Sequence, residues 1–261
     1  MHDIYEKFAC DYDEFGAIED YLGNEKDFFV KLFERYGVRS VLDCACGTGQ
    51  HLYMLSRSGY DVSGSDYSEK MLDVAHKNLE NSGLDIPLYK CDFRYLELKH
   101  TRTFDAVICL TTALPHLHTD DDLILSLKSM KNRLNPGGIL VLTQGITHYS
   151  LSLPPIEVIV NRPDFSRVFV KESDGKFQTI SILDLFHSES RMESNQYDIV
   201  YRIILDDDYK RLLTETGYKN IQIFGDYDMN EYNENSARLI VVAEQNCSKA
   251  KQDRRLSNFV T

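Results

Sequence analysis

The sequence lacks any run of 18 apolar residues, which excludes a membrane-spanning helix. Its first residues, MHDIYEKFACDYDEF, have neither the basic start nor the apolar core of a secretion signal, so we expect a cytoplasmic protein. Positive charge is scarce, because 29 Lys and Arg side chains face 41 Asp and Glu, a formal net charge of -12. Such a field repels polyanions. We therefore expect a small-molecule partner rather than nucleic acid or a membrane.

The six cysteines form no recognisable metal or disulfide pattern. Three of them, Cys44, Cys46 and Cys109, lie in strand-like apolar stretches, where free thiols pack as small apolar groups. The pair Cys44-x-Cys46 has no second pair or nearby histidine to complete a four-ligand set. We expect no metal site.

What the sequence does contain is an alternation of strand and helix patterns through residue 143. Apolar residues make up 43% of the 261 residues, enough for one large α/β domain with an insertion. The strand candidates are 39–44, 60–65, 87–91, 104–110 and 139–143, and the helix candidates between them are 50–58, 68–82 and 120–134, the last stopped by Asn135-Pro136-Gly137-Gly138. Strands alternating with helices predict a parallel sheet with right-handed crossovers.

After residue 143 the pattern changes to consecutive strands at 165–170, 178–187 and 196–204, then a helix at 206–216 and strands at 221–224 and 238–243. The prediction is an α/β fold with a doubly wound, mostly parallel seven-stranded sheet and an antiparallel strand-rich lid. Its parts are a helical cap at 1–36, a Rossmann-like core at 37–145, the lid at 146–204, the rest of the core at 205–245 and a disordered tail at 246–261.

A glycine loop, Asp43-Cys44-Ala45-Cys46-Gly47-Thr48-Gly49, follows the first predicted strand. Ligands of open α/β sheets bind just outside the carboxyl ends of the strands, where glycines let the backbone approach them. The loop lacks the Lys-Ser/Thr pair of a phosphate loop and the third glycine of a dinucleotide site. By itself it predicts a tight turn or a small ligand site.

Two acidic residues follow the next strands. Asp66 can accept hydrogen bonds from ribose hydroxyls, or it can simply favour the start of the helix after it. Asp92-Phe93 puts a carboxylate and an aromatic ring where an adenine can be held, or it forms an Asx turn facing solvent.

The segments VLDCACGTG, GSDYSEKML, CDFRYL and FDAVICLTTALPHL, in this order, resemble the class I S-adenosylmethionine (SAM) dependent methyltransferase family. The resemblance covers residues 35–145 and implies SAM as cofactor, with S-adenosylhomocysteine (SAH) as product. It implies cofactor contacts from Asp43, Ala45, Gly47 and Gly49 to the methionine part, Asp66 to ribose, Tyr67 and Met71 to adenine, Asp92 and Phe93 to the adenine amino group, and Leu110, Thr111 and Thr112 beside the reactive methyl.

Within that family the chain is similar to small-molecule N-methyltransferases of the glycine and sarcosine type, through DCACGTG, DYSEKML, His116 and the tail GDYDMNEYNENSARLIVVAE. It departs from them at Thr111-Thr112, where they carry Asn, and at residues 145–149, where they carry an Arg-Asn-Tyr stretch that grips the acceptor carboxylate. Glycine as acceptor is therefore in doubt unless Arg162, Arg167 or Arg202 substitutes.

Methyl transfer from a sulfonium needs alignment more than acid–base chemistry, and aromatic rings can hold the cationic centre. Tyr5, Tyr12 and Tyr21 suit that role if their segment closes over the site; otherwise they are one face of a packed helix. His116 is a candidate base or a local hydrogen-bonding residue. We take Tyr12, Thr112 and His116 as catalytic candidates, and Tyr5, Tyr21, His148 and Tyr149 as substrate contacts.

Three functions are compatible with the sequence. The first is N-methylation of a small amine or amino acid, glycine or sarcosine being the simplest. The second is O-methylation with His116 or His148 as base, and the third is a non-catalytic SAM-binding or nucleotide-binding protein. The sequence names neither the acceptor nor the oligomeric state, monomer or dimer.

Overall fold

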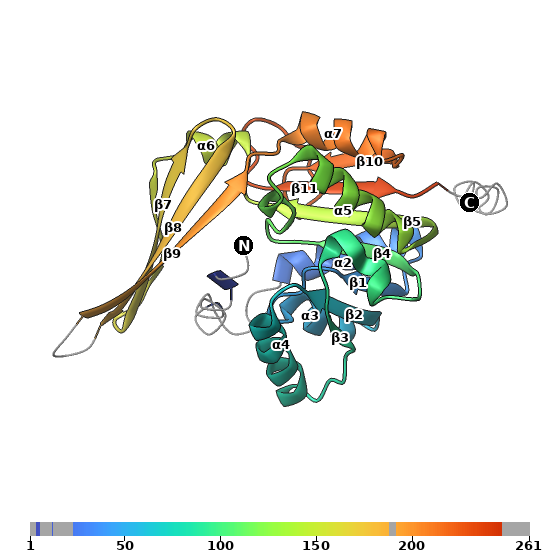
Figure 1. The fold of residues 1–261 in the computed structure, drawn as a ribbon, viewed down its shortest axis with the longest axis horizontal. Helices are drawn as coiled ribbons and strands as arrows, with labels where there is room; N and C mark the ends of the chain where they lie inside the picture. The colour runs from blue at the N-terminus through green and yellow to red at the C-terminus, as the bar shows by residue number, and fades with distance from the viewer. Residues whose placement is uncertain (1–3, 6–11, 13–22, 188–191, 247–261) are drawn as a thin grey trace.

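The computed structural model describes residues 4–5, 12, 23–187 and 192–246, and it contains two separate sheets (Figure 1). The larger sheet has seven strands in the order β10-β11-β5-β4-β1-β2-β3. The five strands from β5 to β3 are parallel to one another, while β11 runs antiparallel to β5 and to β10. The prediction of a mostly parallel seven-stranded sheet is confirmed.

The core elements occur in the predicted order, and their bounds are close to the predicted ones. They are α2 Gly23–Tyr36, β1 Ser40–Asp43, α3 Gln50–Arg57, β2 Asp61–Asp66, α4 Glu69–Asn81, β3 Leu88–Lys90, η2 Phe93–Leu98, β4 Phe104–Cys109, η3 Leu114–His116, α5 Asp120–Asn132, β5 Leu134–Gln144, α7 Asp206–Glu215, β10 Lys219–Phe224 and β11 Leu239–Glu244. None of the described helices is long and apolar enough to cross a bilayer.

Side chains of β1 alternate between two buried clusters, as they must in a sheet that is covered on both faces. Val41 packs with residues of α2, α3 and α4, whereas Leu42 packs with residues of α5 and α7. The strand order reverses between β2 and β4, on either side of β1. The carboxyl end of β1 is therefore the place where such a fold offers a ligand crevice.

β5 begins earlier than predicted. The predicted helix 120–134 ends at Asn132, and the predicted strand 139–143 is part of β5, which starts at Leu134. The register with β4 shifts between Phe104 and Ala106, so the Asn-Pro-Gly-Gly stretch bulges within the strand. A Cβ on Gly138 would lie 2.8 Å from the Asp105 carbonyl oxygen, so this bulge needs a glycine.

The second sheet is the predicted lid. Its strands are β6 Ile156–Asn161, β7 Phe165–Ser173, β8 Phe177–His187 and β9 Met192–Arg202, all antiparallel in the order β6-β7-β8-β9. It lies between β5 and α7 in sequence and beside the end of the core in space (Figure 1). The short helix α6, His148–Ser152, leads into it, and the sequence prediction missed both α6 and β6.

Candidate active site

The glycine loop after β1 is held to the end of β2 by one carboxylate. The Gly47 amide donates to Asp66 Oδ2 at 2.9 Å, and the Ser68 amide donates to Asp66 Oδ1 at 2.9 Å. Gly47 and Gly49 have φ values of 51° and 88°, in the left-handed region that favours glycine. Each carboxylate oxygen has further lone pairs, so Asp66 can still accept hydrogen bonds from a bound ribose.

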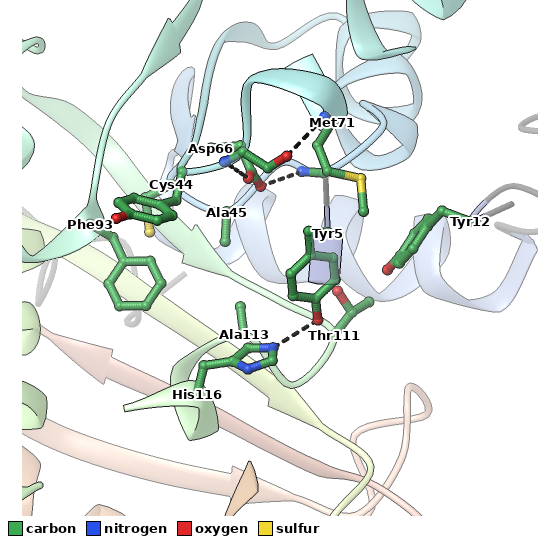
Figure 2. A pocket seen from close by; sticks show the side chains of 13 residues that line it. Tyr5, Tyr12, Cys44, Ala45, Asp66, Met71, Phe93, Thr111, Ala113 and His116 are labelled. Carbon is green, nitrogen blue, oxygen red and sulfur yellow. Dashed lines mark hydrogen bonds between the residues drawn. The ribbon is translucent and has the colours of Figure 1, made fainter. Parts of the chain in front are cut away.

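A cavity opens beside this loop, and most of the predicted cofactor residues line it (Figure 2). The predicted residues on its wall are Tyr5, Tyr12, Ala45, Gly47, Asp66, Tyr67, Met71, Phe93, Thr111 and His116, and the others are Cys44, Ser68 and Ala113. Apolar and aromatic groups thus surround one carboxylate. This chemistry fits an adenosyl group, whose base is flat and apolar and whose ribose carries hydroxyl donors.

Several predicted site residues do not line this cavity. Asp43 lies buried beneath the loop and accepts the Ala45 amide at 3.2 Å, and Leu110 is buried in the core. Gly49 caps α3. Thr112 and Tyr149 line a second cavity instead. Tyr21 lies outside the described residues.

Asp92 and His148 also lie away from both cavities. Asp92 caps η2 by accepting the Arg94 amide, and its carboxylate pairs with the Arg94 guanidinium at 2.6 Å. His148 lies 3.6 Å from Asp206 with its side chain 47% exposed. The structure thus gives both residues ordinary structural contacts.

Asp43 is a carboxylate kept in the core at an electrostatic cost. Burial raises its pKa to about 6, against the lowering influence of His51 and the Ala45 amide. Buried carboxylates with perturbed pKa values gather at functional sites. Its position under the loop fits a role in shaping the cofactor site.

Replacing Asp43 with Asn should change how stability depends on pH. The folded protein binds more protons than the unfolded chain between about pH 4 and pH 6, so the wild type loses unfolding free energy as pH rises through this window, by about 3 kcal/mol at most. The asparagine side chain keeps an oxygen for the Ala45 amide but removes the charge. Denaturant unfolding at pH 4, 5, 6 and 7 should show the difference between variant and wild type growing with pH, while the exposed Asp85→Asn control stays parallel to wild type. Parallel curves for Asp43→Asn contradict the assignment.

A tyrosine and a histidine meet on the wall of this cavity. The Tyr5 hydroxyl lies 2.7 Å from His116 Nε2, and the Tyr201 ring packs 4.7 Å from the His116 ring. Burial lowers the pKa of His116 to about 4, and burial beside Tyr201 raises the pKa of Tyr5. Both groups are therefore neutral near pH 7.

The segment after β4 has a strained backbone. Thr111 and Thr112 have φ values of 52° and 67°, unusual for β-branched residues. Both Thr111 and Thr112 amides donate to Thr143, one to its Oγ1 at 3.0 Å and the other to its carbonyl at 2.9 Å. The strain is thus fixed by β5, and it turns Thr111 into the cavity.

The second cavity, of about 520 Å³, adjoins the first and shares Tyr5, Tyr12 and Thr111 with it. Its other walls come from the start of the lid, one face of the lid sheet and the residues before β11. We call the first cavity the cofactor cavity and the second the acceptor cavity. The sequence analysis missed its Gln178 and Arg238, because only the fold brings these two distant residues to the wall of one cavity. Across the described residues, no group of three or more His, Cys, Asp or Glu side chains is arranged to hold a metal.

Known methyltransferases resemble this chain in sequence. Residues 41–138 match the family model described as a methyltransferase domain. The glycine/sarcosine N-methyltransferase of Parasynechococcus marenigrum is 31% identical, over 78% of this chain and 71% of that protein.

Solved structures share the fold over nearly the whole chain. The CcbJ methyltransferase from Streptomyces caelestis superposes with a TM-score of 0.79 at 19% identity, covering 95% of this chain and 99% of that one. The SAM-bound amino pentose methyltransferase CalS10 from Micromonospora echinaspora gives a TM-score of 0.71 at 20% identity, covering 94% and 98%.

Proposed function

Because the chain belongs to the class I SAM-dependent methyltransferases and is an enzyme of that family, we propose that it methylates the amino nitrogen of a small molecule. The observation that carries this proposal is the neutral Tyr5–His116 pair at the junction of the two cavities. The names of a glycine/sarcosine N-methyltransferase and an amino pentose methyltransferase support the same chemistry. The net charge of -12 supports a small-molecule acceptor over nucleic acid.

The cofactor cavity has groups for each part of SAM. Asp66 is the acceptor for the ribose hydroxyls, Tyr67, Met71 and Phe93 are walls for the adenine, and the Ala45–Gly47 backbone faces the methionine part. Bound SAM supplies a methyl group already activated by the sulfonium. The protein's task is then to align an acceptor with that methyl.

An amine suits the junction because it needs no strong base. The amine lone pair forms the new nitrogen–carbon bond as the carbon–sulfur bond breaks, sulfur keeps the electron pair, and the product nitrogen later releases a proton to water. The Tyr5 hydroxyl oxygen can accept an N–H of the acceptor and so aim the lone pair. The rings of Tyr12 and Tyr201 stabilise the positive charge that the nitrogen gains.

An alcohol or phenol is a less suitable acceptor at this junction. A hydroxyl acceptor must lose its proton during the transfer, and a histidine whose pKa burial lowers to about 4 is a weak base for that task. His148, the other candidate base, lines neither cavity.

A SAM-consumption screen tests the proposal. The panel pairs each amine with its hydroxy analogue: glycine with glycolate, leucine with 2-hydroxyisocaproate, and glucosamine with glucose, alongside sarcosine and dimethylglycine. We expect SAH to form with members of the amine set and not with their hydroxy partners. Turnover of the hydroxy analogues in preference to the amines would contradict it.

A further inference from the structure

The acceptor cavity is much larger than glycine requires. Its volume is about 520 Å³, whereas a cavity of roughly 10–15 Å³ already holds one water molecule, so the five non-hydrogen atoms of glycine fill only a small part of it. Cavities of this size are typical of sites for larger ligands, which fall between roughly 300 and 1,000 Å³. A glycine-sized acceptor would leave most of the space to water.

One wall of the cavity is apolar. Alternate residues of the lid strands point the same way, and β8 places Ile180 and Ile182 on the wall, flanked by Phe169 of β7 and Ile199 of β9. Burying a ligand against such a wall is favourable only if the ligand has apolar surface of its own.

The same face carries an amide side chain. Gln178 is only 4% exposed and lines the cavity, opposite Tyr201 in the β8–β9 ladder. Within the described part of the chain, its side chain makes no hydrogen bond. Its amide can therefore hydrogen-bond to a ligand in the cavity.

The cavity wall also holds a cation, Arg238, just before β11. Its guanidinium stacks 5.3 Å over the Tyr227 ring and forms no ion pair with any described residue. Glu25 lies near enough for Arg238 to help lower its pKa, but no ion pair joins these two described side chains. Lys171, the other cation on the wall, is paired with Glu157. A guanidinium open to a cavity is a site for a carboxylate or phosphate.

The three arginines suggested by the sequence are engaged elsewhere. Arg167 and Asp184 form a fully buried pair at 2.6 Å, Arg202 pairs with Asp120, and Arg162 lies 3.7 Å from Asp164. None of the three lines the acceptor cavity. Arg238, rather than one of these three arginines, is therefore the candidate to bind a carboxylate of the acceptor.

We propose that the acceptor is an amine larger than glycine, with an apolar body and an anionic group. The body packs against the isoleucines of the lid, the anionic group pairs with Arg238, and Gln178 hydrogen-bonds to a polar group on the body. The inference rests on the proposed function and names the class of acceptor within it.

Steady-state kinetics with four probe amines tests this: glycine, leucine, leucinamide without the carboxylate, and glucosamine 6-phosphate with a phosphate instead. We expect kcat/KM for leucine, which has an apolar side chain, to exceed that for glycine at least about tenfold, since one methylene in an apolar pocket gives roughly 10- to 200-fold. Whichever anionic probe is better identifies carboxylate or phosphate as the group at Arg238.

Arg238→Gln should raise KM for both anionic probes about 10- to 100-fold, leave leucinamide unchanged, and be partly rescued in Arg238→Lys. Gln178→Leu should lower kcat/KM without weakening the binding of SAH. Lys128→Gln, which removes a positive charge from the exposed face of α5, is the charge-matched control for Arg238→Gln. Calorimetry with SAH should give the wild-type Kd for Arg238→Gln.

A higher kcat/KM for glycine than for the larger amines overturns the inference while leaving amine methylation intact. Weakened SAH binding in Arg238→Gln also overturns it, because Arg238 then serves the carboxylate of the cofactor.

Discussion

Asp66→Ala lowers the affinity for SAH by about 10- to 100-fold, because a charged acceptor is lost from a partly buried site and each such hydrogen bond contributes about 1.5–3 kcal/mol. The carboxylate also holds the Gly47 and Ser68 amides, so the loop loses its tie to β2. Calorimetric titration with SAH, with thermal unfolding recorded in parallel, measures both consequences.

Two variants make this result specific. Asp66→Asn keeps one acceptor oxygen, and we expect an intermediate loss of SAH affinity. Asp92→Ala removes the acid that sequence resemblance placed at the adenine, but its carboxylate pairs with Arg94, so we expect a smaller loss of affinity than in Asp66→Ala. If Asp66→Ala binds SAH as wild type does, the ribose role of Asp66 is wrong.

His116→Ala should reduce kcat for an amine acceptor about 10- to 100-fold, because Tyr5 loses the partner that orients its hydroxyl. His116→Gln, which can still hydrogen-bond to Tyr5 but cannot titrate, should keep most of the activity. We expect no inflection in the pH profile of kcat near pH 6.5 from this histidine, since burial lowers its pKa to about 4.

A general-base role for His116 predicts the opposite result. If His116 removes a proton in the rate-limiting step, His116→Gln should be as inactive as His116→Ala, a loss of about 10²- to 10⁴-fold. Equal inactivity of the two variants, with the wild-type fold shown by thermal unfolding, would favour an O-methyltransferase.

Most of the core was predictable from sequence because its signals are local. The buried strand at 104–109 is a continuous apolar run, and Ser68 caps α4 through the Met71 amide, as its position before a helical pattern suggests. β6 was missed although its sequence, IEVIVN, is rich in β-branched residues that favour strands; Ile156 and Val158 are exposed in the structure.

The cofactor side of the site was more predictable than its acceptor side, where the sequence predicted Thr112 and Tyr149 but not Gln178 or Arg238. The glycine loop, Asp66 and Phe93 each follow a strand end, and parallel strands bring such ends together. Gln178 and Arg238 carry no motif; they become neighbours of the site only because the fold brings β8 of the lid and the segment before β11 to one cavity. Nothing local in either stretch signals a ligand contact.

The N-terminal tyrosines lie between these cases. Their spacing fitted either a packed helix face or a cap over the site, and the structure places Tyr5 and Tyr12 on both cavities. These two tyrosines are thus shared between the cofactor and acceptor cavities. The choice needed the long-range contact with His116, which is 111 residues away in sequence.

The central claim, methyl transfer to nitrogen at the Tyr5–His116 junction, is tested most directly by locating the transferred group. SAM with an isotope-labelled methyl is incubated with the enzyme and an acceptor that carries both an amine and a hydroxyl, such as tyrosine or glucosamine 6-phosphate, and NMR spectra identify the labelled atom's neighbour. We expect the label on nitrogen, and a label on oxygen would contradict the account.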